Sequence, residues 1–262
     1  MSSQIETPGS SLIADGVARR VIAITGAGGA LGMALSRRLA GEPDTAVVLS
    51  DVARESLDAS VQAAQGAQSP VASALADVSD FDQVEAVVQL AVEQFGRLDV
   101  LISNAGILAP NGRIHNLSTE DWERSFRVNV LGAVNAIRAA VPVMRAQQSG
   151  SIILTASVAG LTAWSHSAPY CATKAAVIQL AKVAAVEYAR DGIRVNCVCP
   201  GTFRSGIHVG LPEEALDTIA ARHPLGLGSA EDLVGAYSYL AGGGSRWTTG
   251  SALVVDGGYS AP

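Results

Sequence analysis

Tyr170 and Lys174 are two side chains whose types and spacing can support proton transfer. They lie four residues apart on a predicted helix, so both project from the same side, one turn apart. A free phenol, with a pKa of ~10, is a poor base near neutrality. An ammonium group ~4 Å away, at an effective dielectric of ~20, would stabilise the phenolate by roughly 4 kcal/mol, or about three pKa units. We therefore expect Lys174 to lower the pKa of Tyr170 towards the pH at which acid–base catalysis is efficient.

Ser157 supplies a third group for such chemistry. It follows the predicted strand 151–156 and precedes Tyr170 by one loop. A serine at a strand end can bind the same oxygen to which a tyrosine at a helix start gives a proton. Each feature alone has an ordinary structural explanation, since tyrosine and lysine four apart are common on helices and most loop serines have no catalytic role. Together they predict acid–base chemistry at an alcohol or a carbonyl group.

A glycine-rich turn follows the first predicted strand, 20–25. Residues 25–32 read TGAGGALG, and a helical pattern begins at once. Glycines in such a turn allow a tight bend, a close approach of the backbone to a phosphate and close packing of helix on strand. The helix N-terminus adds free N–H groups for a pyrophosphate. The spacing differs from the strict G-x-G-x-x-G pattern because Gly32 comes one residue late, so a plain strand–helix turn remains an alternative.

A carboxylate ends the second predicted strand, 46–51. Asp51 follows the glycine turn by about twenty residues, a position from which an acidic side chain binds the adenosine ribose of NAD. Its charge would repel the additional phosphate of NADP, and neither the glycine turn nor Val52 offers a cation for that phosphate. Asp51 therefore favours NAD as the cofactor, although an acid at a strand end also occurs without any ligand.

The scaffold for these groups is predicted from short apolar runs that alternate with amphipathic stretches. This alternation is typical of βα units and predicts an α/β fold, a doubly wound, Rossmann-type parallel sheet of about seven strands with helices on both faces. The predicted strands span 20–25, 46–51, 71–76, 100–103, 151–156, 193–199 and 252–255. The predicted helices span 30–40, 54–65, 82–94, 121–145, 169–190, 213–221 and 231–241.

The domain organisation is expected to be simple. Residues 1–18 have no apolar run and are predicted to form a flexible tail, whereas residues 19–262 are predicted to form one dinucleotide-binding and catalytic domain. Within this domain, the mixed segment 202–228 follows a strand end and is expected to cover the ligand.

The composition argues against several other classes of protein. The 262 residues carry a formal net charge of −6 and no basic run, which argues against nucleic acid as a partner. The four histidines lack a metal-ligand spacing, so no metal is expected, and the three cysteines form no disulfide framework. The uncharged stretch 146–173 is too rich in serine, threonine, glycine and proline for a membrane span. Free thiols without a signal peptide indicate a cytoplasmic protein.

The chain resembles the short-chain dehydrogenase/reductase family from about residue 20 to residue 259. Two positions depart from the family's usual pattern, with Ala30 where a second glycine is common and Ser103 where an asparagine often precedes Asn104. Neither departure touches the predicted chemistry. The residues that carry the resemblance occur in one order: the turn 25–32, Asp77-Val78, Asn104-Ala105-Gly106, Asn129, Ser157, Tyr170 with Lys174, Pro200-Gly201 and Asp256-Gly257-Gly258.

The resemblance implies a role for each matching residue. Tyr170 would be the general acid–base, Ser157 would hold the substrate oxygen, and Lys174 would bind the nicotinamide ribose. Asn129 would bend its helix and hold a water that passes the proton to solvent. Besides Tyr170 and Lys174, the residues that would bind NAD are Thr25, Gly26, Gly28, Ala30, Leu31 and Gly32 in the turn at the pyrophosphate, Asp51 at the adenosine ribose, Asp77 and Val78 at the adenine, Asn104, Ala105 and Gly106 along the cleft, and Pro200, Gly201, Thr202, Phe203 and Ser205 at the nicotinamide.

The predicted reaction is hydride transfer between NAD and a small, fairly hydrophobic secondary alcohol or ketone. The substrate would place its oxygen between Ser157 and Tyr170, and it would contact Leu161, Trp164 and His166 in the loop between them. The family is usually dimeric or tetrameric, so the resemblance implies a homotetramer.

Two other functions remain open at this point. A reductase of ketoacyl thioesters would use the same fold, but that class often favours NADP and a basic entrance, against which Asp51 and the acidic chain argue. A non-enzymatic dinucleotide sensor would need the glycine turn but not Ser157, Tyr170 and Lys174 together.

Overall fold

The computed structural model describes residues 20–66, 69–205 and 213–261. The predicted tail, 1–18, lies outside these residues, as does the part of the predicted covering segment that spans 206–212. Among the described residues, no helix combines the length and the apolarity needed to cross a bilayer.

Seven parallel strands form one sheet in the order β3-β2-β1-β4-β5-β6-β7. The direction in which strands are added reverses between β1 and β4. In open sheets of this kind, ligands bind beyond the carboxyl ends of the strands at such a reversal. The strands are β1 (Arg20–Thr25), β2 (Thr45–Asp51), β3 (Val71–Leu75), β4 (Val100–Ser103), β5 (Gly150–Thr155), β6 (Ile193–Pro200) and β7 (Ala252–Val255).

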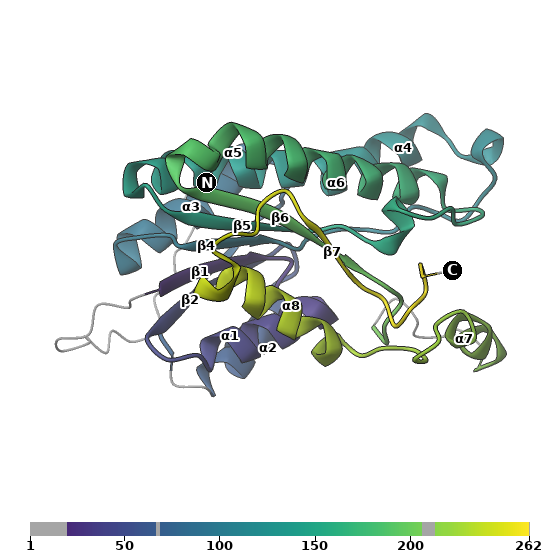
Figure 1. Ribbon diagram of the computed structural model, residues 1–262, viewed down its shortest axis with the longest axis horizontal. Coiled ribbons are helices and arrows are strands. Elements are labelled where there is room, and N and C mark those ends of the chain that lie inside the picture. Colours follow the sequence, from purple (N-terminus) through teal and green to yellow (C-terminus); the bar gives the residue numbers. More distant parts are fainter. Residues whose placement is uncertain (1–19, 67–68, 206–212, 262) are drawn as a thin grey trace.

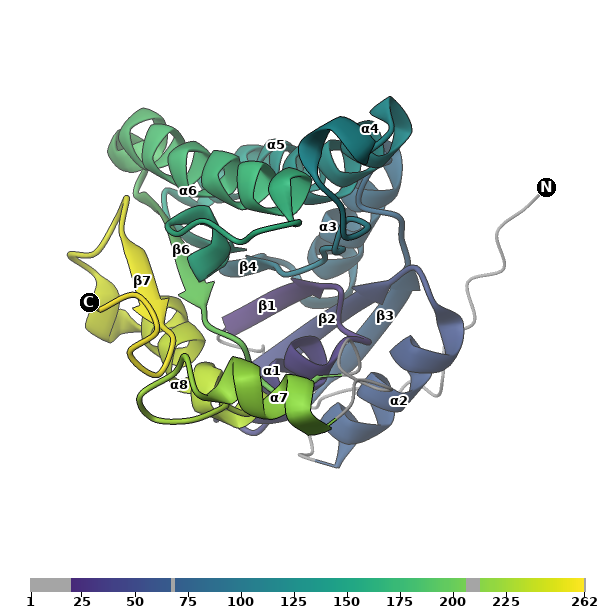
Figure 2. The same cartoon turned by 90° about the vertical axis from the view of Figure 1, so that its right-hand side faces the viewer.

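Helices cover both faces of this sheet (Figures 1 and 2). One face carries α3 (Phe81–Phe95), α5 (Gly132–Gln147) and α6 (Ala168–Tyr188). The other face carries α1 (Ala30–Ala40), α2 (Arg54–Gln65) and α8 (Ala230–Ala241). The short helices α4 (Thr119–Phe126) and α7 (Glu213–Ala220) lie at the end of the molecule towards which the strands point (Figure 1).

The central strands are buried on both faces, which explains their nearly continuous apolar sequences. In β1, Val21 and Ala23 belong to the apolar cluster on the face of α3, α5 and α6, whereas Ile22 and Ile24 belong to the cluster on the face of α1, α2 and α8. This division follows from the alternation of side chains along a strand. All four side chains are fully buried, so β1 is held firmly up to the point at which the glycine turn begins.

The predicted fold class is confirmed, and most predicted elements agree with the structure to within one or two residues. β1, β4, β7, α1 and α2 begin and end as predicted. The continuous helix predicted over 121–145 is wrong, because a π-helix at Arg127–Leu131 separates α4 from α5. π-turns are rare and occur frequently at functional sites. This one contains Asn129, the residue that the resemblance expects to bend its helix.

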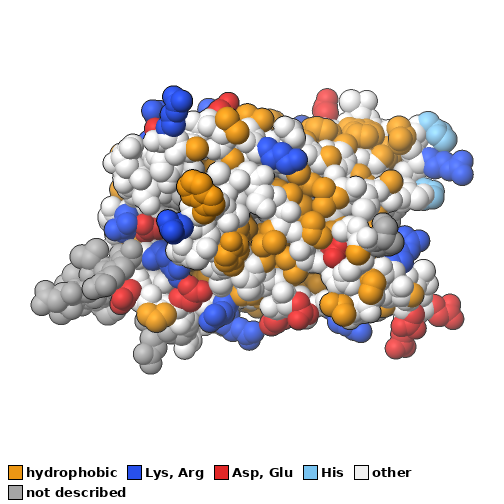
Figure 3. Space-filling view, in the orientation of Figure 1, with side chains coloured by type: hydrophobic (Ala, Val, Ile, Leu, Met, Phe, Trp, Pro, Cys, Tyr) orange, Lys and Arg blue, Asp and Glu red, His pale blue; other side chains and the backbone are white. Residues whose placement is uncertain are grey.

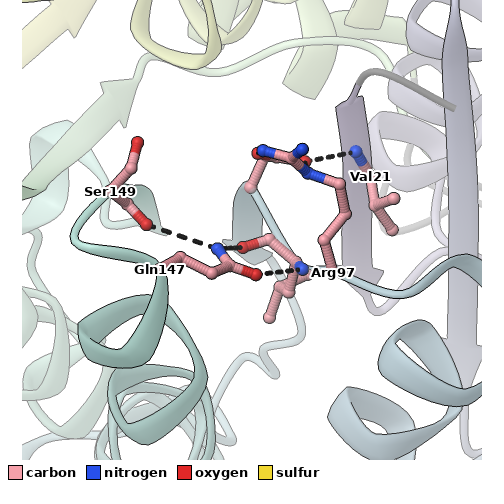
Figure 4. Close-up of polar contacts among 6 residues, drawn as sticks. Val21, Arg97, Gln147 and Ser149 are labelled. Carbon is pink, nitrogen blue, oxygen red and sulfur yellow. Dashed lines mark hydrogen bonds and ion pairs between the residues drawn. The ribbon is translucent and has the colours of Figure 1, made fainter. Parts of the chain in front are cut away.

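Polar contacts at the amino ends of the strands join β1, β4 and α5 (Figure 4). The carboxylate of Asp99 accepts the N–H of Val21 at 2.8 Å and two hydrogen bonds from Arg97, at 2.8 and 2.6 Å. The side chain of Gln147 accepts the N–H of Leu98 at 3.0 Å and donates to its carbonyl at 2.8 Å. These contacts pair backbone groups that the sheet itself leaves without partners.

Candidate active site

A cavity of about 900 Å³ lies beyond the carboxyl ends of the strands. Its walls come from the glycine turn after β1, the ends of β2, β3 and β4, and the loops after β5 and β6. The cavity therefore brings together groups that are far apart in the sequence. The predicted cofactor-binding and catalytic residues that line it are Gly26, Gly28, Ala30, Leu31, Asp51, Asp77, Val78, Asn104, Ala105, Gly106, Ser157, Tyr170, Lys174, Pro200, Gly201, Thr202, Phe203 and Ser205.

The glycine turn has the backbone shape that a phosphate cradle needs. Gly26 has a φ of 63°, in the left-handed region that glycine adopts without strain, and a Cβ there would lie 2.6 Å from the Cα of Ala105. The side chain of Asn104 donates to the Gly26 carbonyl at 3.0 Å. Gly29 precedes α1 and supplies no side-chain cap, so the helix start keeps the free N–H donors that suit an anion.

Two residues of this motif shape the turn from behind. Gly32 is absent from the cavity wall, and a Cβ there would lie 2.1 Å from the carbonyl oxygen of Gly26. Thr25 is buried, and its Oγ1 accepts the N–H groups of Asn104 at 3.1 Å and Ala105 at 3.3 Å. Both residues therefore hold the turn in shape, and their contact with the cofactor stays a prediction.

Asp51 lies beside this turn and forms the other half of a cradle. Its carboxylate accepts the N–H of Gly28 at 2.9 Å and the N–H of Ala53 at 3.0 Å. A Cβ on Gly28 would lie 3.0 Å from Asp51 Oδ2 and 2.5 Å from the Cβ of Ser56, so the space here depends on glycine. Bare backbone next to a carboxylate acceptor fits a dinucleotide with a pyrophosphate and a ribose diol.

Ser157 and Tyr170 meet on the cavity wall. Ser157 follows β5 at the start of the 3-10 turn Val158–Gly160, and its Oγ accepts the N–H of Ala159 at 3.1 Å. Tyr170 lies in the first turn of α6, and its phenol is near enough to Ser157 for the serine to lower the pKa of the tyrosine. Two hydroxyl groups from different elements therefore converge at one place, which is the geometry that binding and protonating one oxygen requires.

Lys174 lies one turn further along α6, and its side chain is buried. Its Nζ donates to the carbonyl of Thr155 at 2.8 Å and lies 5.6 Å from the ring centroid of Tyr170. Burial lowers the pKa of Lys174 to about 8, against a smaller opposite effect of Cys199. Gly106 makes room for the ammonium group, because a Cβ there would lie 3.3 Å from Nζ.

The pKa of Tyr170 corrects one expectation from the sequence. Burial raises this pKa above the ordinary value of a tyrosine, and the hydrogen bond of Ser157 lowers it by less. The prediction that Lys174 lowers the pKa of Tyr170 below its ordinary value is therefore wrong for the protein without a bound ligand. The physical reason is that the phenol loses its hydration on burial, while the lysine is directed to the Thr155 carbonyl.

Asn129 is bound to the loop after β4 and to α6 and does not line the cavity. Its Nδ2 donates to the carbonyl of Ile107 at 2.9 Å and to Thr173 Oγ1 at 3.1 Å. Its Oδ1 accepts the N–H of Ile107 at 2.8 Å. The side chain thus connects the π-helix to the helix of Tyr170, whereas its role in holding a water remains a prediction.

Of the three residues predicted to contact only the substrate, Trp164 lines the cavity. Leu161 and His166 are absent from the cavity wall, and both are exposed. The loop turns sharply at His166, whose φ is 65°, and its Nδ1 is hydrogen-bonded to Ser165 Oγ at 2.8 Å. The contact of Leu161 and His166 with the substrate stays a prediction that the cavity wall does not support.

Sequence reasoning missed part of the cavity wall. Most of the missed residues adjoin a predicted residue at a strand end, and this adjacency is the signal that would have found them. Arg124 and Arg127 differ, since they come from α4 and the π-helix, away from any such motif. The missed residues are Gly29, Val52, Ala76, Ser79, Ile107, Leu108, Arg124, Arg127, Val128, Thr155 and Ala156.

Comparison with known proteins identifies the class to which this fold and site belong. The family model described as enoyl-(acyl carrier protein) reductase matches residues 26–260. The chain belongs to the short-chain dehydrogenase/reductase family, as the resemblance predicted. It is thus related over nearly its whole length to NAD(P)-dependent oxidoreductases that act on alcohols and ketones.

Two curated relatives act on different substrates. The cis-4-hydroxycyclohexanecarboxylate dehydrogenase of Sinomonas cyclohexanicum is 39% identical over 245 residues, which cover 93% of this chain and 98% of the relative. The 3-oxoacyl-(acyl-carrier-protein) reductase FabG of Thermotoga maritima is 37% identical over 240 residues, with 91% and 97% coverage.

Solved structures of similar proteins contain either cofactor. An NAD+-bound xylitol dehydrogenase has a TM-score of 0.87 at 30% identity, covering 91% of this chain and 98% of that one. ElxO with bound NADP has a TM-score of 0.87 at 30% identity, with 93% and 99% coverage. The fold alone therefore permits both dinucleotides.

Proposed function

We propose that the protein transfers a hydride between NAD and a small, fairly hydrophobic secondary alcohol or ketone. The observation that carries this proposal is the convergence of Ser157 and Tyr170 on the wall of a cavity that also contains Lys174 and the glycine turn. NAD, when bound, would supply the hydride chemistry. The protein's own groups would orient the alcohol and move its proton.

Each of the three polar side chains has a distinct part in this reaction. Ser157 would hold the substrate oxygen next to the Tyr170 hydroxyl, since both side chains lie on the cavity wall. Tyr170 would accept the hydroxyl proton during oxidation and return it during reduction. Lys174, with a pKa of about 8, would be mostly protonated at pH 7 and would stabilise the phenolate by its charge.

Asp51 supports NAD over NADP. Its carboxylate lines the cavity beside the glycine turn, where an additional ribose phosphate would meet a like charge. The next residue, Val52, is 71% exposed and offers that phosphate no cation. We expect kcat/KM to be at least ~10-fold higher with NAD than with NADP, corresponding to about 1.4 kcal/mol. Initial rates with the two dinucleotides measure this ratio.

The wall of the cavity supports a fairly hydrophobic substrate. Ile107, Leu108, Val128, Trp164 and Phe203 contribute apolar side chains. The relative named for cis-4-hydroxycyclohexanecarboxylate supports a cyclic secondary alcohol. The test is the absorbance of reduced cofactor, followed with acyclic, cyclic and aryl secondary alcohols. Cyclic and aryl alcohols should give the highest kcat/KM, and no turnover of any alcohol or ketone with either dinucleotide would contradict the proposal.

A reductase of ketoacyl thioesters is the second candidate, favoured by the 37% identity to FabG. The same assay discriminates between them when a ketoacyl thioester and reduced NADP are included. A kcat/KM for the thioester above that for every simple ketone would replace the first proposal by the second. A dinucleotide sensor, in contrast, would bind NAD without turning over any member of the panel.

We further propose that the chain assembles as a homotetramer. Hydrophobic side chains gather across the middle of the face that carries α6, β7 and α8 (Figure 3). Val186 on α6 is 81% exposed, and Trp247, between α8 and β7, is 95% exposed. Large exposed apolar side chains of this kind support an interface between subunits. Light scattering should give four times the chain mass of 26.8 kDa, and a monomer would contradict the proposal.

A further inference from the structure

The indole of Trp164 is held on the cavity wall by its neighbours and by no hydrogen bond of its own among the described residues. Its Nε1 is buried and lacks an acceptor there. Its ring packs against the ring of Tyr170, with centroids 6.1 Å apart, and edge-on against Tyr259, with centroids 6.2 Å apart. Aromatic contacts of this geometry stabilise the ring positions beyond the effect of burial. The position of Trp164 therefore depends on Tyr170 on one side and Tyr259 on another.

Tyr259 belongs to the C-terminal segment after β7 and is not part of the cavity wall. Behind it lies the ring of His223, at a centroid distance of 4.8 Å. Tyr259 is thus packed between Trp164, which lines the cavity, and a histidine from the segment after α7. It has the position of a support and not of a substrate contact.

His223 is a rigid base for this support. It is only 4% exposed, and both ring nitrogens are hydrogen-bonded. Nε2 accepts the N–H of Thr202 at 3.1 Å, which leaves Nδ1 to donate to the carbonyl of Ile219 at 2.9 Å. Since Thr202 lines the cavity, His223 fixes a second part of its wall.

The C-terminal segment that carries Tyr259 is itself anchored. The carboxylate of Asp256 accepts the N–H of Gly258 at 2.9 Å and both the N–H and the hydroxyl of Ser260, at 2.8 and 2.6 Å. The N–H of Leu225 donates to the carbonyl of Gly257 at 3.0 Å, joining this segment to the one that contains His223. Tyr259 is therefore held from both its own segment and its neighbour.

We propose that Tyr259, supported by His223, is a positioning residue for substrate selection: it holds Trp164 against the cavity and so limits the size of the alcohol that fits. This inference rests on the proposed function for its consequence in catalysis. Without the ring of Tyr259, Trp164 gains room to move back, and the substrate end of the cavity widens. The kcat/KM for bulky alcohols then rises relative to that for small ones, while the dinucleotide cradle at the glycine turn stays unchanged.

The kinetic test compares Tyr259→Ala with the ring-retaining control Tyr259→Phe. The readout is the ratio of kcat/KM for cyclohexanol to kcat/KM for the larger 2-decalol, together with the Kd of NAD. Tyr259→Ala should lower this ratio about tenfold, the size of a change of one or two methylene groups in an apolar pocket. Tyr259→Phe should keep the ratio within about twofold, and neither variant should change the Kd of NAD by more than about twofold.

A double-mutant cycle with Trp164→Ala tests whether Tyr259 acts through Trp164. Trp164→Ala alone should lower the ratio at least as much, and adding Tyr259→Ala should then change it by less than about twofold. Three results would overturn the inference. The ratio could stay unchanged in Tyr259→Ala, or Tyr259→Ala could cause the same shift in the Trp164→Ala background. Tyr259→Ala could also weaken NAD binding as much as it changes the ratio.

A measurement without turnover separates this inference from the proposed function. In a Trp122→Phe, Trp247→Phe background, Trp164 is the chain's remaining tryptophan. Tyr259→Ala should shift its fluorescence to the red and increase its quenching by acrylamide, while Tyr259→Phe should do neither. Unchanged emission and quenching in a folded Tyr259→Ala variant would refute the support by Tyr259 even if the protein oxidises alcohols. Altered emission in a protein that turns over no alcohol would leave the support intact and refute the proposed function alone.

Discussion

Replacing Lys174 by methionine should abolish turnover and at the same time stabilise the folded protein at neutral pH. Burial lowers the pKa of Lys174 from its ordinary 10.5 to about 8, so the fold disfavours the charged form. At 1.36 kcal/mol for each tenfold change, this difference corresponds to about 3 kcal/mol. Methionine keeps most of the buried volume but loses the hydrogen bond to Thr155, which contributes ~1 kcal/mol. The net gain at pH 7 should therefore be about 2 kcal/mol in the free energy of unfolding.

The sign of the pH dependence follows from the same lowered pKa. Between pH 8 and 10.5 the unfolded chain binds a proton on Lys174 that the folded protein has released. Stability rises with pH wherever the unfolded state binds more protons. From pH 7 to 9.5 this linkage should stabilise the parent by about 2 kcal/mol relative to Lys174→Met, so the two proteins should become nearly equal in stability.

Urea unfolding of the dinucleotide-free proteins at pH 7 and pH 9.5, at one protein concentration, measures both effects. Lys182→Met is the matched control, since Lys182 lies on the same helix and is exposed. Its difference from the parent should not change with pH. A Lys174→Met variant that is less stable than the parent at pH 7, or whose difference stays constant up to pH 9.5, would refute the reasoning.

Three further predictions concern the cradle, the lysine site and the opposite end of the sheet. Asp51→Ala should lower the NAD-to-NADP ratio of kcat/KM at least ~10-fold, because the repelling carboxylate is removed; an unchanged ratio in steady-state kinetics would exclude the ribose contact. Gly106→Ala should lower kcat by at least ~10-fold, because its Cβ would lie 3.3 Å from Lys174 Nζ and displace it; kcat like that of the parent would show that the site tolerates this crowding. Asp99→Asn should lower the free energy of unfolding by about 1–3 kcal/mol, because the hydrogen bonds to Val21 and Arg97 become weaker, while kcat/KM stays within twofold of that of the parent. A large loss of kcat/KM with unchanged stability in urea unfolding would contradict a purely structural role of Asp99.

The sheet and the cradle were predictable because their determinants are local. Apolar runs such as 20–25 and 100–103 can only be buried strands in a βα pattern, and the glycine turn has its meaning in consecutive residues. The convergence of Ser157 and Tyr170 was also predictable, because the carboxyl ends of parallel strands meet at one edge.

The features that escaped prediction depend on burial and on contacts between distant segments. The raised pKa of Tyr170 follows from desolvation, which the four-residue spacing to Lys174 does not reveal. The resemblance indicated a bend at Asn129, but helix propensity gave no sign of the π-helix, in which the Asn129 side chain is hydrogen-bonded to Ile107 and Thr173. The packing of Trp164 against Tyr259 joins a loop to the C-terminal segment, and nothing in either sequence indicates it.

The decisive measurement is the turnover of Tyr170→Phe with NAD and the best alcohol of the panel, beside Tyr239→Phe as a control. Tyr239 is exposed on α8, and its hydroxyl is hydrogen-bonded to Thr248 at 2.9 Å, outside the cavity. Loss of the general acid–base should lower kcat at least ~100-fold in Tyr170→Phe, with the Kd of NAD nearly unchanged, while Tyr239→Phe should behave as the parent. A Tyr170→Phe enzyme that retains the parent's kcat would show that the phenol does not move the proton.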